Sequence, residues 1–261
     1  MNTLNFESLF DIKGKVAVVT GGTRGIGFMI AMGLVQAGVK TYVVSRKAEA
    51  CAEAEAQLNR YGEAIAIAAD LSSMDELESL AAKFVELEPK LHILVNNAGA
   101  SWGASFNDFP ESGWDKVMNL NLKSIFFLTQ KLSSALFAAG TDSDPARVIN
   151  IGSVDGLTSP KMGNYSYSAS KAGLHHLTRH LAADLAPANI NVNAIAPGPF
   201  ETKMTEFLLK ENADAITSNI PRRRTGHALD VAGTAIFLAS AASAYITGAV
   251  IPLDGGFSTT R

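Results

Sequence analysis

Short, almost wholly apolar runs alternate along this chain with longer alanine-rich segments, and this alternation constrains the fold more than any other feature. The apolar runs expected to form strands are residues 15–19, 40–44, 64–69, 91–95, 147–151, 190–195 and 249–253. Because polar residues do not alternate with apolar ones in these runs, both faces of each strand are expected to be buried. The sequence therefore predicts an α/β fold with a doubly wound parallel sheet of about seven strands and helices on both faces.

The segments between these strands carry helical features. The expected helices are residues 28–36, 49–61, 73–87, 114–139, 165–185 and 228–239, of which 114–139 and 165–185 are expected to be long. No composition break, linker or repeat divides the chain, so residues 1–261 are interpreted as a single domain with an N-terminal extension at 1–12. The stretch 198–226 lacks strand character and is predicted to be a substrate lid, because loops of this size usually have a function.

Composition excludes several classes of function. The chain has 22 basic and 25 acidic residues and a net charge of −3, so no nucleic-acid partner is expected. The one cysteine, Cys51, cannot form an internal disulfide, and the five histidines show no metal-site spacing. No apolar run approaches the roughly 18 residues of a membrane helix, and the N-terminus does not resemble a signal peptide. We therefore expect a cytoplasmic protein with no metal and no membrane partner.

Glycines cluster between the first expected strand and the first expected helix, in the sequence TGGTRGIG at residues 20–27. Glycine lets the backbone turn sharply and approach a pyrophosphate, and the following helix directs free N–H groups at the anion. The spacing differs from G-x-G-x-x-G, so the place of the turn between strand and helix distinguishes it from an ordinary glycine-rich turn. The predicted contacts to a dinucleotide here are Gly21, Thr23, Arg24, Gly25, Ile26 and Gly27.

The end of the second expected strand indicates which dinucleotide binds. An acid at this point binds the ribose 2′-hydroxyl of NAD, whereas a basic group accepts the 2′-phosphate of NADP. Ser45 stands where the acid is expected, Arg46 follows it, and Arg24 lies inside the glycine turn. Because arginines pair with a phosphate that an acid would repel, the sequence predicts NADP(H) as the cofactor. The alternative is that Arg46 only ends a strand at the surface.

Tyr167 and Lys171 lie four residues apart in the expected helix 165–185 and so share one face. A free tyrosine has a pKa of about 10, so only about 0.1% is ionised near pH 7. A neighbouring ammonium group favours the ionised form. We expect Lys171, together with a bound nicotinamide cation, to lower the pKa of Tyr167 enough for acid–base catalysis.

Two polar residues strengthen this interpretation. Ser153 follows the fifth expected strand, at the sheet edge where open α/β folds bind ligands. Its hydroxyl is a candidate partner for a substrate carbonyl oxygen that Tyr167 would protonate. Asn121 lies within an expected helix, where a buried asparagine needs a partner such as a water or a backbone carbonyl. The alternative is that Asn121 is an ordinary polar helix residue.

Small residues follow the fourth and sixth expected strands and permit close approach of a flat cofactor. The fourth strand is followed by Asn97, Ala98 and Gly99. The sixth is followed by Pro197 and Gly198, and the hydroxyl of Thr202 is a candidate partner for a carboxamide. These residues complete a set of candidate cofactor contacts at one edge of the sheet.

These motifs, together with TG at 247–248 and DGG at 254–256, resemble the short-chain dehydrogenase/reductase family over roughly residues 13–257. The resemblance implies a single Rossmann-type domain that transfers hydride between a nicotinamide and a carbonyl/alcohol pair. It implies that Tyr167 is the general acid/base and that Lys171 binds the nicotinamide ribose and lowers the pKa of the tyrosine. It also implies that Ser153 orients the substrate and that Asn121 supports a water chain from the lysine.

The resemblance supplies the remaining cofactor contacts. Asp70 and Leu71 match the residues beside the adenine, and Asn97 matches the residue beside the adenosine ribose. The residues around the carboxamide would be Ile195, Pro197 and Thr202. One departure is that the family's Gly-Arg-x-Gly-x-Pro-Glu is replaced by RRTGHAL at residues 223–229, so Asp230 is expected to take over the role of the acid.

The expected substrate pocket is lined by residues 101–106, 154–165 and 200–220. This lining is largely apolar, which favours an acyl chain or a hydrophobic ketone over a sugar. The candidate substrate contacts, besides Ser153, are Trp102, Phe200 and Met204. The alternative is that these apolar residues pack the lid against the body or against another subunit. The basic run Arg222–Arg224 either steers an anionic carrier or is a solvated surface feature.

We therefore expect an NADP(H)-dependent oxidoreductase that acts on a 3-oxoacyl thioester or a related ketone. The stretches 97–104 and 149–154 resemble those of NADPH-dependent β-ketoacyl reductases in the family. The alternatives are a polyol or sugar-acid dehydrogenase of the gluconate 5-dehydrogenase kind, and a non-catalytic dinucleotide-binding redox sensor. The partner is a small-molecule carbonyl or acyl-thioester substrate, and the resemblance implies a homotetramer or homodimer formed through the long helices and the last strand.

Overall fold

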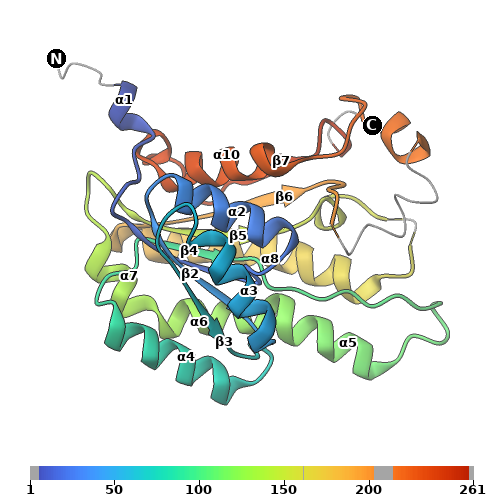
Figure 1. The fold of residues 1–261 in the computed structure, drawn as a ribbon. Helices are drawn as coiled ribbons and strands as arrows, with labels where there is room; N and C mark the ends of the chain where they lie inside the picture. Colours follow the sequence, from blue (N-terminus) through green and yellow to red (C-terminus); the bar gives the residue numbers. More distant parts are fainter. Residues whose placement is uncertain (1–5, 161, 203–213, 259–261) are drawn as a thin grey trace.

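Seven parallel strands form one sheet in the order β3-β2-β1-β4-β5-β6-β7 (Figure 1). The computed structural model describes residues 6–160, 162–202 and 214–258. The strands are β1 Val16–Thr20, β2 Lys40–Ser45, β3 Ala64–Ala68, β4 Ile93–Asn96, β5 Ala146–Ile151, β6 Ile190–Pro197 and β7 Val250–Leu253. Strand order runs outward in both directions from β1, which is the doubly wound topology. The α/β fold expected from the alternating apolar runs is therefore confirmed.

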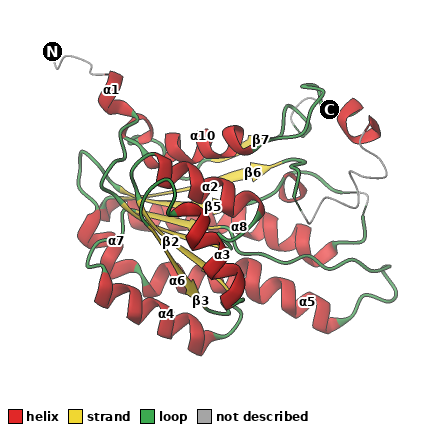
Figure 2. Cartoon of the chain, in the orientation of Figure 1, coloured by secondary structure: helices red, strands yellow, loops and turns green. Residues whose placement is uncertain are grey.

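Helices cover both faces of the sheet (Figure 2). On one face α2 packs against α10, with α3 beside them, and on the other face lie α4, α6, α7 and α8. The helices are α1 Phe6–Leu9, α2 Gly25–Gln36, α3 Ala48–Leu58, α4 Met74–Leu87, α5 Glu111–Met118, α6 Ser124–Lys131, α7 Ser133–Ala139, α8 Tyr165–Leu185 and α10 Ala228–Ala239. Short 3₁₀ turns occupy Val154–Gly156, Ala186–Ala188 and Ala241–Ser243.

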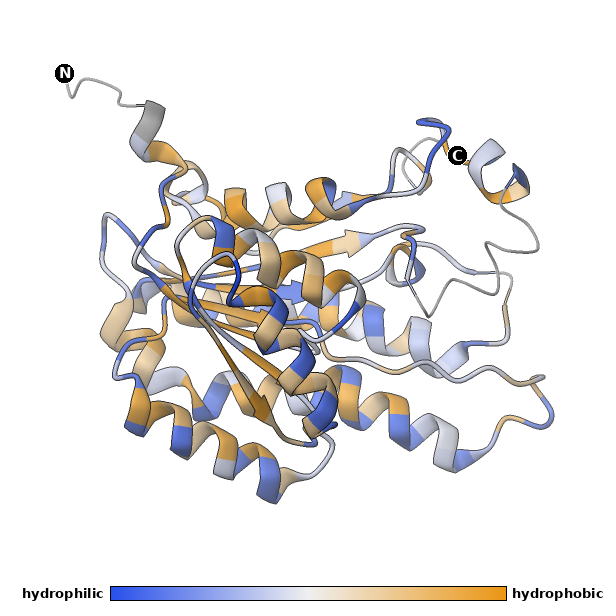
Figure 3. Cartoon of the chain, in the orientation of Figure 1, coloured by the Kyte–Doolittle hydropathy of each residue, from blue (hydrophilic) through white to orange (hydrophobic). Residues whose placement is uncertain are grey.

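The strands are buried on both faces because their side chains alternate between two separate cores. Val19 of β1 belongs to the core beneath α2 and α10, whereas Val18 belongs to the core beneath α4 and α6. Both side chains are buried. Burial of one such side chain contributes about 1.5–3 kcal/mol. In Figure 3 the strands in the middle of the molecule are mostly orange, and blue residues concentrate on the outer faces of helices such as α4.

The expected single helix over 114–139 is wrong in its start and in its continuity. It begins earlier, as α5, and then passes through a π-helical turn, Asn119–Lys123, before α6 starts at Ser124. A further break at Leu132 separates α6 from α7. A π turn is rare and needs tertiary support, which here comes from hydrogen bonds made by the side chain of Asn121. The other long helix, 165–185, has the bounds expected from the sequence.

Helix α3 ends three residues before the expected Tyr61. The side chain of Asn59 accepts a hydrogen bond from the Ala64 N–H at 2.8 Å and donates to the Ala64 carbonyl at 3.0 Å. An asparagine that bonds to nearby backbone competes with the helix for its hydrogen bonds, so the chain turns here into β3. Among the residues that the structure describes, no helix is both long enough and apolar enough to span a bilayer.

Candidate active site

The carboxyl ends of the parallel strands bring the predicted site residues to one edge of the sheet. The glycine turn follows β1, Asn97 follows β4, Ser153 follows β5, and Gly198 follows β6. These four strands are neighbours in the sheet, so the segments that follow them lie together. Helix α8, which carries Tyr167 and Lys171, packs against β6 and against the 3₁₀ turn after Ser153.

The glycine turn is held open by backbone geometry that other residues adopt with strain. Gly21 and Gly25 have φ angles of 63° and 54°. A Cβ on Gly27 would lie 2.3 Å from the Gly21 carbonyl oxygen, so no side chain fits there. The side chain of Asn97 stabilises the turn by donating hydrogen bonds to the carbonyls of Thr20 at 2.9 Å and Gly21 at 3.2 Å.

The first turn of α2 fits an anion. Its N-cap is Arg24, which is extended at φ −163° and makes no side-chain hydrogen bond to the helix N-terminus. The free N–H groups there are open to a phosphate. Thr202 also comes to this turn, because its methyl carbon lies 3.4 Å from where a Cβ on Gly25 would be. The structure thus brings two of the predicted cofactor segments, after β1 and after β6, into contact.

The ends of β2 and β3 carry an ion pair that sequence reasoning did not foresee. Arg46 is exposed, and its guanidinium lies 3.9 Å from the carboxylate of Asp70. The side chain of Ser72 holds that carboxylate with a 2.7 Å hydrogen bond. Burial raises the pKa of Asp70, but hydrogen bonds from Ser72 and the charge of Arg46 outweigh it, so the pKa is lowered. The sequence indicates this ion pair only in that residues of opposite charge follow β2 and β3, which are neighbouring strands of the sheet.

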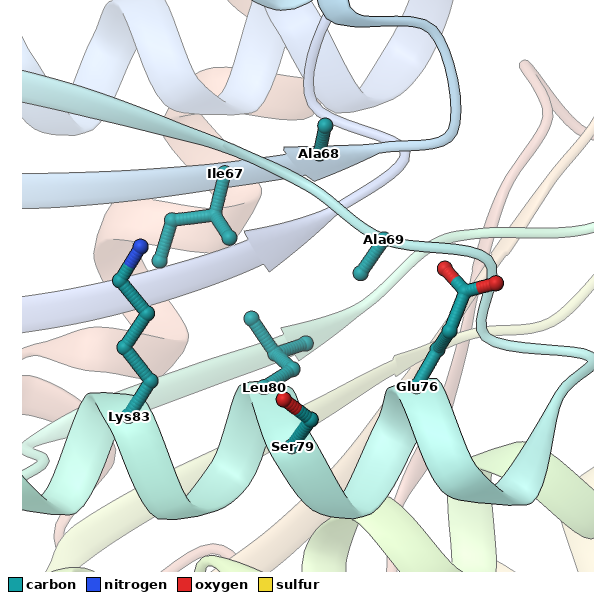
Figure 4. A pocket seen from close by; sticks show the side chains of 7 residues that line it. All are labelled: Ile67, Ala68, Ala69, Glu76, Ser79, Leu80 and Lys83. Carbon is teal, nitrogen blue, oxygen red and sulfur yellow. The ribbon is translucent and has the colours of Figure 1, made fainter.

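A pocket of about 190 Å³ lies between the end of β3 and α4 (Figure 4). The side chains of Glu76, Leu80 and Lys83 point from α4 toward the strand. Glu76 also accepts a 2.7 Å hydrogen bond from the backbone N–H of Asp70. The predicted adenine contacts Asp70 and Leu71 are therefore fixed from α4, and this pocket contains none of the predicted catalytic residues.

Tyr167 and Ser153 come together at the carboxyl edge. The Ser153 side chain is close enough to the Tyr167 phenol to lower its pKa. Ser153 is 7% exposed, and its oxygen accepts the N–H of Asp155 at 3.1 Å. This bond caps the 3₁₀ turn and fixes the direction of the serine side chain. The arrangement holds two hydroxyls side by side at the position where ligands bind in such sheets.

Lys171 lies under the tyrosine but is not bonded to its hydroxyl. Its ammonium nitrogen is 5.6 Å from the centroid of the Tyr167 ring and donates to the Ile151 carbonyl at 2.6 Å. Only 4% of the lysine is exposed, and this burial lowers its pKa to about 8. A buried lysine with one carbonyl partner is a group whose proton can be released near neutral pH.

A lower pKa of Tyr167 was expected from Lys171 together with a bound nicotinamide cation, and the protein by itself shows a shift in the other direction. Burial raises the pKa of Tyr167 to about 12, because the hydrogen bond with Ser153 only partly offsets it. The negative charge of Asp155 raises it further.

Asn121 is wholly buried, and both polar atoms of its side chain are hydrogen-bonded. Its side-chain oxygen accepts the Ala100 N–H at 2.8 Å, and its nitrogen donates to the Ala100 carbonyl at 2.9 Å. The same nitrogen donates to the Ser170 hydroxyl of α8 at 3.1 Å. This excludes the alternative of an ordinary polar helix residue, and it explains why the small Gly99 stands beside it, since a Cβ there would lie 3.2 Å from the Asn121 oxygen.

The predicted substrate contacts divide into three cases. Phe200 is 2% exposed and belongs to the core beneath α10, with its ring over Gly226, so it packs in the interior and does not face an open pocket. Trp102 packs on α5, against Gly113 and 5.2 Å from the Lys116 ammonium. Met204 lies outside the described residues. The sequence could not distinguish a core phenylalanine from a pocket one.

Asp230, the residue expected to take over the role of the family's acid, lies in the first turn of α10. This residue accepts two hydrogen bonds from the Arg224 guanidinium, at 2.6 and 2.9 Å, and one from the His227 N–H at 2.9 Å. The Arg224 bonds lower the pKa of Asp230 to about 2. Asp230 therefore caps α10, and Arg224 is committed to it. No group of three or more potential metal ligands exists in the described part of the chain.

Comparison with known proteins matches this architecture. A family model described as "Enoyl-(Acyl carrier protein) reductase" matches residues 21–258. A rhamnolipids biosynthesis 3-oxoacyl-[acyl-carrier-protein] reductase of Pseudomonas aeruginosa is 48% identical, over 95% of this chain and 98% of that protein. The chain belongs to the short-chain dehydrogenase/reductase family. The expected resemblance to the β-ketoacyl reductases of the family is thereby confirmed.

Other members of the family are also similar. The structure of a Pseudomonas aeruginosa RhlG/NADP active-site complex has a TM-score of 0.93 and 47% identity, covering 96% of this chain and 99% of that one. A 2-dehydro-3-deoxy-D-gluconate 5-dehydrogenase of Escherichia coli is 38% identical, over 96% of this chain and 98% of that protein. The sugar-acid dehydrogenases are thus more distant than the oxoacyl reductase.

Two residues around the short-chain dehydrogenase/reductase site escaped sequence reasoning. Asp155 accepts a 2.9 Å hydrogen bond from Asn164 at the start of α8. His175 is 2% exposed, and its ring fills the space beside Gly152 and Gly156, where a Cβ would lie 2.1 and 2.8 Å from ring atoms. In the sequence, the space for the His175 ring is indicated by Gly152 and Gly156, which lie on either side of Ser153.

Proposed function

We propose that this protein is an NADP(H)-dependent reductase of 3-oxoacyl thioesters or closely related ketones. The observation that carries the proposal is the close approach of Tyr167 and Ser153, with Lys171 beside the tyrosine ring, at the edge where the glycine turn lies. The 48% identity to a 3-oxoacyl-[acyl-carrier-protein] reductase over 95% of the chain supports the choice of substrate. Relatives with bound NADP support the choice of cofactor.

The residues of the site fit NADP(H). A Cβ on Gly21, Gly22 or Gly27 would clash with neighbouring atoms, and the N-terminus of α2 is free of a side-chain cap, which suits a pyrophosphate. Arg46 and Arg24, both exposed, suit a 2′-phosphate. The other residues that would hold the cofactor are Gly21, Thr23, Gly25, Ile26, Gly27, Ser45, Asp70, Leu71, Asn97, Ala98, Gly99, Tyr167, Lys171, Pro197, Gly198 and Thr202. When bound, NADPH supplies the hydride for the carbonyl carbon.

The chain's own residues handle the proton. In reduction the substrate oxygen takes the hydroxyl proton of Tyr167, while the Ser153 hydroxyl holds that oxygen in line. Lys171, with its pKa lowered by burial, is a candidate to restore the proton. Asn121 fixes the Ala100 backbone and the Ser170 hydroxyl beside this path. In alcohol oxidation the same residues act in reverse.

The surroundings of the site favour an apolar substrate over a sugar acid. Phe106, Leu157 and Met162, from the segments after β4 and β5, are 79%, 38% and 48% exposed. A sugar acid would require several fixed polar partners, whereas an acyl chain is satisfied by apolar contacts. The sugar-acid dehydrogenase remains the second candidate because of the 38% identical relatives.

A substrate panel tests the proposal. The purified protein is assayed with NADPH and NADH in parallel against 3-oxoacyl thioesters and keto-sugar acids, by the loss of absorbance of the reduced cofactor. We expect turnover of the oxoacyl thioesters with NADPH. Turnover of keto-sugar acids alone would favour the second candidate, and NADPH binding without any turnover would favour a redox sensor.

We also infer a single domain over 1–261, with 1–12 as an extension and 198–226 as a lid, working in the cytoplasm as a homotetramer or homodimer. Exposed apolar side chains support assembly: Trp114 and Phe137, on the α5–α7 segment, are 41% and 46% exposed, and β7 is an edge strand. Light scattering after size-exclusion chromatography gives the mass of the assembly, and a monomer would contradict this inference.

A further inference from the structure

A buried histidine that the proposed reaction does not use lies against the turn that carries Ser153. His175 belongs to α8 and is 2% exposed. A Cβ on Gly152 would lie 2.1 Å from its Nε2 atom, and a Cβ on Gly156 would lie 2.8 Å from its Cε1 atom. The ring therefore contacts the backbone on both sides of the serine.

The two glycines are required by the close approach of α8 and not by the shape of the turn. Neither has a positive φ angle, so the backbone conformation at both positions is open to other residues. At Gly152 the three atoms nearest to a Cβ all belong to the His175 ring. At Gly156 the two nearest are backbone atoms of Lys171 and Ala172, at 2.7 and 2.8 Å. Removal of the ring would therefore make room at Gly152 but not at Gly156.

The polar atoms of the ring are not engaged, so the ring acts through its shape. Burial lowers the pKa of His175 to about 4, against the opposite effect of the nearby Gly156 backbone, so the ring is neutral near pH 7. In the described structure neither ring nitrogen has a hydrogen-bond partner of ordinary geometry. A neutral ring in a close-packed interior fixes its neighbours by filling the space between them.

Gly152 directly precedes the serine of the proposed reaction and is held from two sides. Its N–H donates to the Ile195 carbonyl of β6 at 2.7 Å, and its other side lies against the His175 ring of α8. The ring therefore sets how closely the start of the serine turn approaches the helix that carries Tyr167. This spacing matters for catalysis, because a misplacement of about 1 Å can cost about 10²-fold in rate.

We propose that His175 is a positioning residue whose ring holds the Ser153 turn at the distance from α8 that lets Ser153 and Tyr167 bind one substrate oxygen. The inference rests on the proposed function for its reaction. The contacts of the ring are at the serine turn, whereas the glycine turn that suits the pyrophosphate follows β1. Loss of the ring is therefore expected to lower kcat and to leave the affinity for NADPH nearly unchanged.

The test changes both sides of the contact and measures kcat with acetoacetyl-coenzyme A, a 3-oxoacyl thioester, and NADPH affinity by fluorescence titration. His175→Ala is expected to lower kcat by about 10–100-fold, with little change in the dissociation constant of NADPH. Gly152→Ala is expected to lower kcat as well, because its Cβ would meet the ring. In the double variant, Gly152→Ala should cost no further activity, because the ring that it would meet is gone.

Three controls separate positioning from a general loss of packing. Gly156→Ala must stay impaired when it is combined with His175→Ala, because the α8 backbone still blocks its Cβ. His176→Ala makes the same change at the neighbouring, exposed position and should have no effect. Leu136→Ala opens a cavity in the core beneath α4 and α6, so it should lower the free energy of unfolding while kcat per folded molecule stays unchanged.

A graded series covers the case in which an alanine variant does not fold. His175→Leu fills the space with an apolar side chain and should keep kcat within a few-fold of the original, since volume-conserving changes are tolerated best. His175→Val fills less of it and should give a kcat between those of the leucine and alanine variants. A kcat that does not depend on side-chain size among the folded variants overturns the proposal.

Crystal structures of the same variants give a readout that needs no turnover. In His175→Ala and His175→Val the Ser153 hydroxyl oxygen should be displaced relative to that of Tyr167, and in His175→Leu it should keep its place. A serine that is not displaced in either smaller variant overturns the proposal. The expected displacement in a protein that reduces no oxoacyl thioester leaves the positioning role standing and overturns the proposed function instead.

Discussion

The two ends of the sheet each bury a cation. In the described structure one of these cations has a carboxylate partner and the other does not. At the amino end of β5, Arg147 is 1% exposed, donates to the carbonyls of Pro145 and Ser240, and lies 3.5 Å from the carboxylate of Asp144. At the carboxyl end, Lys171 is 4% exposed and donates to one carbonyl, with no carboxylate partner in the described structure.

This difference separates structural from functional charge. Burial lowers the pKa of both side chains, but the negative charge of Asp144 opposes the shift at Arg147, whereas burial alone acts on Lys171. The amino end is therefore built for stability, and Lys15 reinforces it with a 2.8 Å contact to the same Asp144. The carboxyl end has a buried lysine whose pKa is lowered by burial beside a tyrosine, which is typical of catalytic sites.

The largest effect should come from the carboxyl end. Tyr167→Phe removes the proton donor and should lower kcat by about 10²–10⁴-fold, the usual contribution of general acid–base catalysis. NADPH binding, followed by fluorescence titration, and the midpoint of unfolding should change little. Activity within a few-fold of the original protein would remove Tyr167 from its role.

The amino end should respond in stability instead. Arg147→Met removes the guanidinium that donates to the Pro145 carbonyl, and loss of that bond costs about 1–3 kcal/mol. The Ser240 carbonyl also loses the guanidinium but still accepts from the N–H and the hydroxyl of Ser243. The free energy of unfolding from denaturant titration should fall by about 1–3 kcal/mol, while activity per folded molecule stays unchanged. Lys171→Met is the matched variant, expected to lose activity with little loss of stability. Equal destabilisation by both variants would end the distinction between the two ends.

Cofactor preference should change at the carboxyl end without a change in stability. Arg46→Asp places a second acid beside Asp70, 3.9 Å from the original guanidinium, where it would repel a 2′-phosphate. The ratio of kcat/KM for NADPH to that for NADH should fall at least about tenfold, the usual loss for one charge-assisted hydrogen bond. A ratio that stays fixed would contradict the assignment of Arg46 to the phosphate.

The last expected effect is a pH dependence of stability. The pKa of Lys171 is about 8 in the folded protein and 10.5 when solvated, so between these values the unfolded chain binds more protons. Stability from this group therefore rises with pH from about 8 to 10.5. Denaturant titrations at pH 8 and 10 should show this contribution in the original protein but not in Lys171→Met. The same slope in both would show that other groups cause it.

The sequence predicted the parts of the fold that depend on local pattern. Apolar runs such as 190–195 located strands because a strand buried on both faces has no polar side. The sequence did not predict the π turn at 119–123, because that turn exists only through the contact of Asn121 with the Ala100 backbone. It also could not separate Phe200, which is in the core, from a pocket residue, because both positions require an apolar side chain.

The same distinction holds for the site: residues fixed by local chemistry were predicted from the sequence, and contacts between distant segments were not. The glycine turn, Ser153 and Tyr167 were found because chemistry imposes residue types on them at fixed places relative to strands. The sequence did not predict that burial and Asp155 raise the pKa of Tyr167 in the protein by itself, because spacing reveals neither of them. Contacts between charges from different segments, such as Arg46 with Asp70, require the register of the sheet.

The π turn at 119–123 also determines how the helical segments after it are rotated about their axes. A regular α-helix advances about 100° per residue, so removing one residue to restore ordinary winding would rotate α6 by that angle about its axis. Leu128, now in the core beneath the sheet, would be turned away from it. Asn121 thus keeps two helical segments rotated relative to each other, so that one can serve the ligand edge while the other fills the interior.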